Sequence, residues 1–252
     1  MSRSCNGSFY VIIILFMFTD NYKFADKTVE VNSIYGKVHD YCKEYRTDEP
    51  ADYAVTTSEA DIDFEKSRSD IKAFSDDYYE ELAVYRKICE KMPYYDTILF
   101  HCSVVSVDGI AYAFAAPSGT GKSTHAALWR ELLGERAVMV NDDKPLLHIV
   151  EDVTAYGTPY DGKHHISNKI AVPLKAVCIL ERGEKNCIER ISSKDAYPVI
   201  VQQTYRPMDV TALGKTMELI DILTQKVELY RLHCNMDIEA AKVSYEGMNG
   251  AC

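Results

Sequence analysis

Residues 111–128, AYAFAAPSGTGKSTHAAL, decide the fold that this sequence predicts. Apolar residues 111–115 predict a buried strand, and residues 123–133 predict a helix. Between them, Gly119 and Gly121 let consecutive backbone N–H groups point to one side of the loop, because no Cβ obstructs them. A strand, a small-residue loop, a Lys-Ser pair and a helix, in this order, are typical of a backbone that wraps a polyphosphate.

Individual residues of this stretch have separate expected tasks. Lys122 supplies a point charge for the β- and γ-phosphates, and the Ser123 hydroxyl is suited to Mg²⁺. The positive N-terminal end of the helix faces the same anion. The usual Walker A pattern begins with glycine where this chain has Ala116, so an ordinary strand-to-helix turn is the alternative interpretation. The predicted nucleotide-binding residues are Ala116, Pro117, Ser118, Gly119, Thr120, Gly121, Lys122, Ser123 and Thr124.

Composition limits the function classes. A chain of 252 residues that is 47% hydrophobic and 26% charged can bury a sizeable core, as one large domain or as a small one plus a larger one. A net charge of −10 argues against a nucleic-acid partner, because phosphate neutralisation needs clustered Lys and Arg. Eight cysteines without C-x-x-C spacing fit neither a zinc site nor a disulfide framework, so reduced thiols and a cytoplasmic location are favoured.

The N-terminal residues contain a short apolar run. Residues 9–18, FYVIIILFMF, are too few to span a bilayer. Their β-branched and aromatic composition predicts a buried strand, and no membrane partner is expected. A secretion signal or membrane anchor is the alternative interpretation.

Pro93 marks a change of pattern along the chain. Before it we expect strands at 27–31 and 54–57, short helical structure at 33–45, an irregular charged segment at 61–75 after a Ser58 N-cap, and a helix at 77–92. We therefore predict a smaller accessory α+β domain over residues 1–92 and a P-loop nucleotide-binding domain over residues 93–252.

The second part predicts a mixed sheet with helices, since strands and helices do not alternate strictly. A strand at 97–107, the turn Asp108-Gly109 and a strand at 110–115 predict a β-hairpin that leads into the loop. Further expected elements are strands 137–140, 172–180, 187–191 and 228–233, a hairpin over 146–155, and helices 124–133, 194–205, 211–226 and 237–246.

Three groups outside the loop carry candidate chemistry. Asp142 and Asp143 end the strand after the loop's helix, where one carboxylate can hold Mg²⁺ and the other accept a proton, although a turn before Pro145 would use the same residues. His101, predicted on the neighbouring strand, can orient a nucleophile, whereas a satisfied core histidine is the plain alternative. Polar residues in the 156–169 segment and three arginines are candidate phosphate contacts or solvated surface, namely Lys163, His164, His165, Asn168, Lys169, Arg182, Arg190 and Arg206.

Taken together, His101, then PSGTGKS at 117–123, then NDDK at 141–144, resemble the HPr kinase/phosphorylase family, and more distantly the nucleotide-binding core of phosphoenolpyruvate carboxykinase. The resemblance is good over residues 95–180 and absent before Pro93. It implies that Asp142 is the general base, that Ser123 and Asp143 hold the metal, and that His101 positions the acceptor or the base. Ala116, Cys102 after His101, and the lack of a counterpart for the family's second metal-binding glutamate are departures from the family pattern.

The sequence thus predicts an ATP-dependent, Mg²⁺-requiring kinase that phosphorylates a hydroxyl of a peptide, protein or small molecule. Its predicted catalytic residues are Asp142, His101 and Lys122, and a homo-oligomer is compatible with the sequence. Two alternatives are a nucleotide-binding sensor without transfer activity and a carboxykinase-like enzyme.

Overall fold

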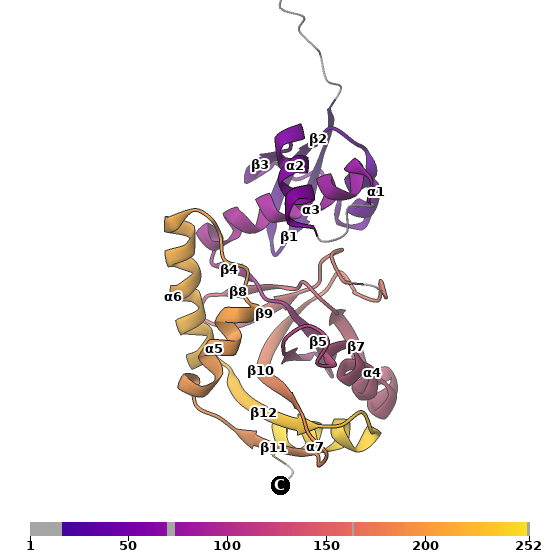
Figure 1. Cartoon of the computed structure of the whole chain (residues 1–252), viewed down its shortest axis with the longest axis vertical. Coiled ribbons are helices and arrows are strands. Elements are labelled where there is room, and N and C mark those ends of the chain that lie inside the picture. The colour runs from indigo at the N-terminus through magenta and orange to yellow at the C-terminus, as the bar shows by residue number, and fades with distance from the viewer. Residues whose placement is uncertain (1–16, 70–73, 163, 251–252) are drawn as a thin grey trace, which may run out of the picture.

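The computed structural model describes residues 17–69, 74–162 and 164–250 (Figure 1). Nearly all of the strand predicted over residues 9–18 lies outside this part, and strand β1 begins at Phe18. Within the described ranges, no helix combines the length and the apolar character needed to cross a membrane. The chain is a mixed α/β protein built around two sheets, as the sequence predicts.

The N-terminal sheet contains three strands, in the order β1 (Phe18–Phe24), β2 (Lys27–Ser33) and β3 (Tyr53–Thr56). The first pair is antiparallel and the second is parallel. Three helices accompany this sheet, namely α1 (Lys37–Tyr41), α2 (Glu59–Arg68) and α3 (Asp76–Lys91). Figure 1 shows these elements gathered at one end of the molecule.

Helix α2 corrects the prediction of irregular structure after Ser58. Ser58 and Asp61 form a reciprocal capping box that satisfies the first free N–H groups of the helix. Arg86 of α3 then forms ion pairs with Asp61 at 3.2 Å and with Glu65 at 2.5 Å. Acidic residues of α2 therefore pair with an arginine of α3, and the spacing of apolar residues alone does not reveal this contact.

The α-helix predicted over residues 77–92 ends at Lys91, just before Pro93, as the sequence predicts. Helix α3 continues directly into a 3₁₀ helix over Met92–Tyr95, in which Pro93 occupies an early position. A proline is tolerated there because its missing N–H would have no helical partner. Asp96, with a positive φ of 53°, then turns the chain into the second sheet.

The larger sheet has nine strands and is mixed. Its central path runs β4 (Thr97–Leu99), β8 (Leu146–Ile149), β9 (Val153–Tyr156), β10 (Ala171–Arg182), β6 (Ile110–Ala115), β5 (Cys102–Val107) and β7 (Ala137–Asn141). Strand β12 (Glu228–Cys234) also pairs with β10, and β11 (Cys187–Arg190) pairs with β12. Strand β10 is parallel to β6 and β12 but antiparallel to β9.

Two layers of helices cover this sheet because its central strands are apolar on both faces. On β10, Val177 and Ile179 face one core, whereas Cys178 and Leu180 face the other. Residues of α5 (Ser193–Gln203) and α6 (Val210–Lys226) complete the first core. Residues of α4 (Lys122–Leu133) and α7 (Ile238–Met248) complete the second. Figure 1 shows the two helix pairs on opposite sides of the strands.

The predicted strand over 97–107 is divided in two. Strand β4 pairs with β8, and β5 pairs with β6 and β7. Between them the His101 N–H donates to the Gln203 carbonyl at the end of α5, at 2.7 Å. His101 therefore lies in a break between strands rather than within one, because the chain changes partners at this point.

A shared apolar cluster joins the two sheets. Side chains from β1, β2 and α3 pack with Leu146 of β8 and Tyr160, which follows β9. Polar contacts cross the same junction: the Tyr85 hydroxyl donates to the Lys144 carbonyl at 2.8 Å, and the Tyr205 hydroxyl donates to Glu90 at 2.6 Å. The N-terminal part thus presses against the segment that follows Asp143.

Candidate functional site

The loop between β6 and α4 is open on one side. Gly119 and Gly121 have φ angles of 77° and 121°, in the region that favours glycine. A Cβ built on either glycine would meet no atom within 4 Å. The loop therefore surrounds space instead of its own side chains, and α4 begins directly after it at Lys122.

Lys122 is held against this loop. It is buried, and its Nζ donates to the Ala116 carbonyl at 2.9 Å. Burial lowers the pKa of Lys122, while the nearby Cys102 thiol and the carboxylates of Asp143 and Asp142 act to raise it. An ammonium has three N–H donors, so the contact with Ala116 leaves capacity for an anion.

Asp142 is directed toward the beginning of α4. Its Oδ1 accepts a hydrogen bond from the Ser103 hydroxyl at 2.7 Å. Burial raises the pKa of Asp142, whereas the side chains of Ser103 and Ser123 and the nearby His164 lower it, with a net rise. A buried carboxylate beside a helix N-terminus and a serine hydroxyl is ready to share a cation with that serine.

Asp143 has a different partner. The His101 Nε2 lies 2.8 Å from Asp143 Oδ1, and the Lys144 ammonium lies 3.8 Å from Oδ2. Burial acts to raise the pKa of Asp143, but the hydrogen bond from His101 and the charges of Lys144, His101 and Lys122 outweigh it and lower the pKa. Asp143 is therefore an ionised carboxylate at neutral pH, able to accept a proton.

These side chains surround one cavity of about 420 Å³, which we call the loop cavity. Asp142 and Asp143 both reach it because each follows the end of β7, where the alternation of a strand no longer applies. The predicted site residues that line it are His101, Ser118, Gly119, Gly121, Lys122, Ser123, Thr124, Asp142, Asp143 and His164. The structure thus brings residues 101, 118–119, 121–124 and 142–143 together, although they are distant in sequence.

Other candidates lie elsewhere. Asn168 donates to the Met139 carbonyl at 2.8 Å, and Lys169 donates to the Glu44 carbonyl at 2.8 Å, so both serve packing between segments. Arg206 donates to its neighbour Val201, and Arg190 is an exposed residue 3.9 Å from Glu228. Lys163 lies outside the described residues.

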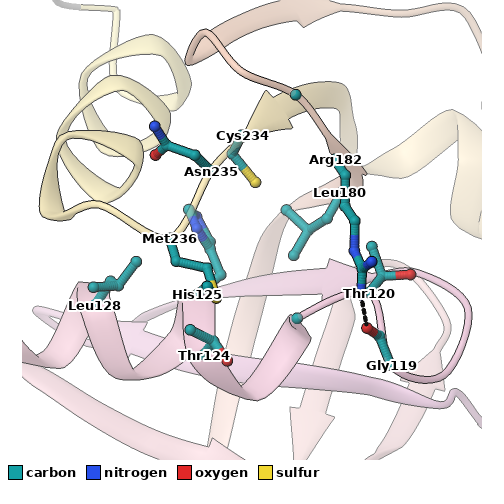
Figure 2. A pocket seen from close by; sticks show the side chains of 12 residues that line it. Gly119, Thr120, Thr124, His125, Leu128, Leu180, Arg182, Cys234, Asn235 and Met236 are labelled. Carbon is teal, nitrogen blue, oxygen red and sulfur yellow. Dashed lines mark hydrogen bonds between the residues drawn. The ribbon is translucent and has the colours of Figure 1, made fainter.

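A second cavity of about 470 Å³ adjoins the loop cavity and is called the β10 cavity (Figure 2). The two cavities share Gly119, Gly121 and Thr124. Leu128, Leu180 and Met236 supply apolar surface, and Arg182 donates from Nη2 to the Gly119 carbonyl at 2.6 Å. Figure 2 shows this guanidinium pointing from the end of β10 to the loop.

Sequence reasoning does not identify two neighbours of the aspartates. Ser103 is an ordinary residue of an apolar strand, and only the pairing of β5 with β7 places it beside Asp142. Gly162 has a φ of 74°, and a Cβ there would lie 3.3 Å from that of Asp143. The pair Asp161-Gly162 is typical of a turn and is the feature of the sequence that could have pointed to Gly162. The close approach of Gly162 to Asp143, however, depends on tertiary structure.

The donor set suits a divalent cation only in part. Asp142, Asp143 and the Ser123 hydroxyl offer hard oxygen ligands, as Mg²⁺ prefers. Within the described ranges, however, no cluster of three or more His, Cys, Asp or Glu residues is placed to hold a metal by itself. The residues therefore fit a metal that shares its coordination with phosphate oxygens.

Comparisons with known proteins do not identify the function of this chain. No protein-family model and no curated protein sequence matches this chain. Among solved structures, the chain has a likeness to the Hpr(Ser) kinase/phosphatase from Coxiella burnetii, with 8% identity and a TM-score of 0.33 over 61% of this chain and 95% of that one. A likeness of this size carries no argument about activity, so any functional conclusion must come from the site itself.

Proposed function

We propose that this protein is a kinase that transfers the γ-phosphoryl group of ATP to a hydroxyl acceptor with the help of Mg²⁺. One observation carries the proposal: an open glycine loop, Lys122 and the paired carboxylates of Asp142 and Asp143 line a single cavity. The loop amides and Lys122 supply positive potential for phosphates, and the two carboxylates supply metal and proton sites.

The two adjoining cavities suggest how the nucleotide lies. In our proposal the loop cavity holds the phosphates, and the β10 cavity holds the nucleoside against Leu128, Leu180 and Met236. Such a division is expected, because phosphates need N–H donors and charge, whereas a base needs apolar surface. Arg182, anchored on the Gly119 carbonyl, lies at the boundary of the two parts.

We further propose that the roles expected for the two aspartates are exchanged. Asp142 and Ser123 line the same cavity, and the Ser123 side chain acts to lower the pKa of Asp142, so we assign these two residues to the metal side of the site. Asp143, ionised and paired with His101, is the general base. As the acceptor oxygen bonds to the γ-phosphorus, its proton passes to Asp143, and the bond from that phosphorus to the β–γ bridging oxygen breaks.

Mg²⁺, when bound with the nucleotide, would neutralise charge on the phosphate oxygens. Ser123 and Asp142 would hold it, and Lys122 would bind the β- and γ-phosphates. His101 acts through Asp143 and is a positioning residue in this scheme.

The test combines binding and transfer. We expect Lys122→Met to weaken ATP binding by at least about tenfold, since a buried charge-assisted contact is lost. Asp143→Asn should retain binding and lose transfer by about 10² or more. Lys242→Met, an exposed lysine on α7, is the matched control. Binding is measured by titration calorimetry and transfer with γ-labelled ATP and pooled hydroxyl compounds.

Two outcomes would contradict the proposal. If the unaltered protein does not bind ATP, the loop does not serve a nucleotide. If it binds ATP but neither hydrolyses it slowly nor phosphorylates any compound, the protein is a nucleotide sensor rather than a kinase. Equal loss of binding in the Lys122 and Asp143 variants would remove Asp143 from the role of base.

A further inference from the structure

A third cavity lies on the other side of Asp143 from the loop. It has a volume of about 430 Å³, and Asp143 and Gly162 border both this space and the loop cavity. We call it the α3 cavity, because helices α1 and α3 form one wall and the segments after β7 and β9 form the other. The residues of interest in its lining are Lys37, Tyr41, Tyr78, Glu81, Tyr160 and Asp161.

Glu81 is the unusual group in this cavity. Only 6% of its surface is exposed, yet within the described ranges no residue donates a hydrogen bond to its carboxylate or forms an ion pair with it. By contrast, its neighbour Glu80, also buried, accepts hydrogen bonds from the Ile34 and Tyr35 N–H groups at 2.7 Å each. The Glu81 oxygens are not among the described side-chain atoms that are sealed from solvent without a hydrogen-bond partner, so they open to the α3 cavity. Glu81 thus presents to this cavity a carboxylate that the described residues leave available for a ligand cation.

The two other carboxylates of the cavity, Asp143 and Asp161, already have partners. Asp161 is buried and accepts a hydrogen bond from the Ser167 N–H at 2.9 Å, with the His165 Nδ1 3.0 Å from its other oxygen. The nearby cations also have partners, since Lys37 lies 3.5 Å from Asp77 and Lys144 lies 3.8 Å from Asp143. Among the carboxylates of this cavity, Glu81 thus stands apart, because no residue of the described ranges is in contact with it as a counter-ion.

Tyrosine rings line the same cavity as this carboxylate. Tyr160 stacks on Tyr85 with ring centroids 3.7 Å apart, and Tyr41 meets Tyr160 edge to face at 5.3 Å. Tyr78 adds a third ring to the lining. Aromatic faces around an anion are a favourable environment for an organic ammonium, which gains both ion pairing and cation–π attraction when it is removed from water.

We propose that the α3 cavity binds the phosphoryl acceptor, and that this acceptor carries a protonated amine which pairs with Glu81 while its hydroxyl approaches Asp143. The inference rests on the proposed kinase function and adds the acceptor class to it. It also gives the N-terminal part a task, because α1 and α3 supply Lys37, Tyr41, Tyr78 and Glu81. Free amino alcohols and a serine peptide with a neighbouring lysine both present this chemistry.

The experiment compares matched acceptors. Ethanolamine, 3-aminopropanol and serine are tested against ethylene glycol and 1,3-propanediol, and a Ser-Lys peptide is tested against its Ser-norleucine analogue. We expect kcat/KM for the amine-bearing member of a pair to exceed that of the neutral member by at least about tenfold. The free compounds and the peptide pair tell which source of the ammonium the cavity accepts.

The substitution Glu81→Gln keeps the shape of this side chain and removes its negative charge. We expect it to reduce the preference for the amine at least about tenfold while ATP affinity and acceptor-independent ATP hydrolysis stay unchanged. Glu218→Gln, an exposed position on α6, is the matched control. Since Glu81 lacks hydrogen-bond donors in the fold, the variant should melt at the same or a higher temperature, which a purely structural glutamate would not do.

The outcomes separate the two proposals. Three results would overturn the acceptor inference and leave the kinase proposal intact. They are a preference for neutral alcohols, a preference for the amine that is unchanged in Glu81→Gln, and ATP binding and hydrolysis without phosphorylation of any amine-bearing compound. Failure to bind ATP would overturn both. Amine preference that disappears with Glu81→Gln but not with Glu218→Gln would establish the inference.

Discussion

The imidazole Nε2 of His101 lies 2.8 Å from the Oδ1 of Asp143, at the point where the loop cavity and the α3 cavity meet. Asp143 borders both cavities, whereas Asp142 borders the loop cavity. Two adjacent carboxylates thus have separate surroundings, one toward Ser123 and the other toward His101. In the proposed function, this division assigns one aspartate to the metal and the other to the proton.

The first prediction concerns the pH dependence of transfer. The hydrogen bond from His101 opposes burial and helps to lower the pKa of Asp143, so His101→Ala should raise that pKa. The base must be ionised, and the acid side of the kcat profile should therefore move to higher pH. We also expect kcat at neutral pH to fall by about 10². ATP affinity, measured in parallel, should stay unchanged, and an unshifted profile would contradict the pairing's proposed role.

The second prediction concerns Mg²⁺. Because no described cluster of three or more metal-ligating residues exists here, Mg²⁺ alone should give no saturable binding by calorimetry, whereas Mg²⁺ with ATP should bind. Asp142→Asn should raise the Mg²⁺ concentration for half-maximal activity by at least about tenfold, and Ser103→Ala, which removes the hydrogen bond to Asp142, by about tenfold.

Asp152→Asn, an exposed carboxylate in the turn after β8, is the control for charge. Tight Mg²⁺ binding in the absence of nucleotide would show a complete protein metal site and would remove the reason for a shared one.

Much of the fold could be predicted because local signals agree with tertiary structure. The Asp108-Gly109 turn, with φ angles of 51° and 83°, gives the predicted β5–β6 hairpin. Gly134, with a positive φ, follows the last residue of α4, which ends at Leu133 as the helix predicted over 124–133 does. Two predictions fail because they depend on contacts between distant segments. Helix α2 forms where irregular structure was expected, because Arg86 of α3 pairs with its acidic residues. The strand predicted over 97–107 divides, because the His101 N–H donates to the Gln203 carbonyl at the end of α5.

The site shows the same limit. Residues 116–124 form one continuous motif, and the aspartates follow a strand that sequence order places nearby, so their types and spacing are sufficient to predict them. Glu81 is different, because its helix contains ordinary charged residues and only the contact of α3 with the segment after β9 buries its carboxylate. Sequence alone also does not tell Asp142 from Asp143, since their distinction lies in Ser123 and His101.

The third prediction tests the nucleoside position. Met236 is largely exposed at the rim of the β10 cavity, so its side chain can be shortened without disturbing a core (Figure 2). Met236→Ala should weaken ATP binding several-fold, about 1 kcal/mol for the lost apolar contact, and should leave binding of inorganic tripolyphosphate unchanged. Met208→Ala, a similarly exposed methionine outside the cavity, is the control. Equal effects on both ligands would place the nucleoside elsewhere.

The fourth prediction rests on the proton positions around His125, which ties α4 to α7. The Ser244 hydroxyl donates to the Ala241 carbonyl at 3.0 Å and accepts from Trp129 Nε1 at 2.8 Å. The hydrogen bond between His125 Nε2 and Ser244, at 3.0 Å, has the imidazole as donor when the single hydroxyl proton of Ser244 goes to Ala241. In that tautomer His125 Nδ1 is unprotonated, and no described atom pairs with it.

Protonation of that nitrogen would place a charge in the core, and burial accordingly lowers the pKa of His125 from 6.5 to about 4. At pH above 6.5 the imidazole is neutral in both folded and unfolded chains, so stability is full. As pH falls from 6.5 to about 4, the unfolded chain binds a proton that the folded chain excludes, and unfolding becomes easier by about 3 kcal/mol in total. Urea unfolding followed by Trp129 fluorescence should show this loss, and His125→Gln should reduce it; an equal loss in both proteins would contradict the neutral imidazole.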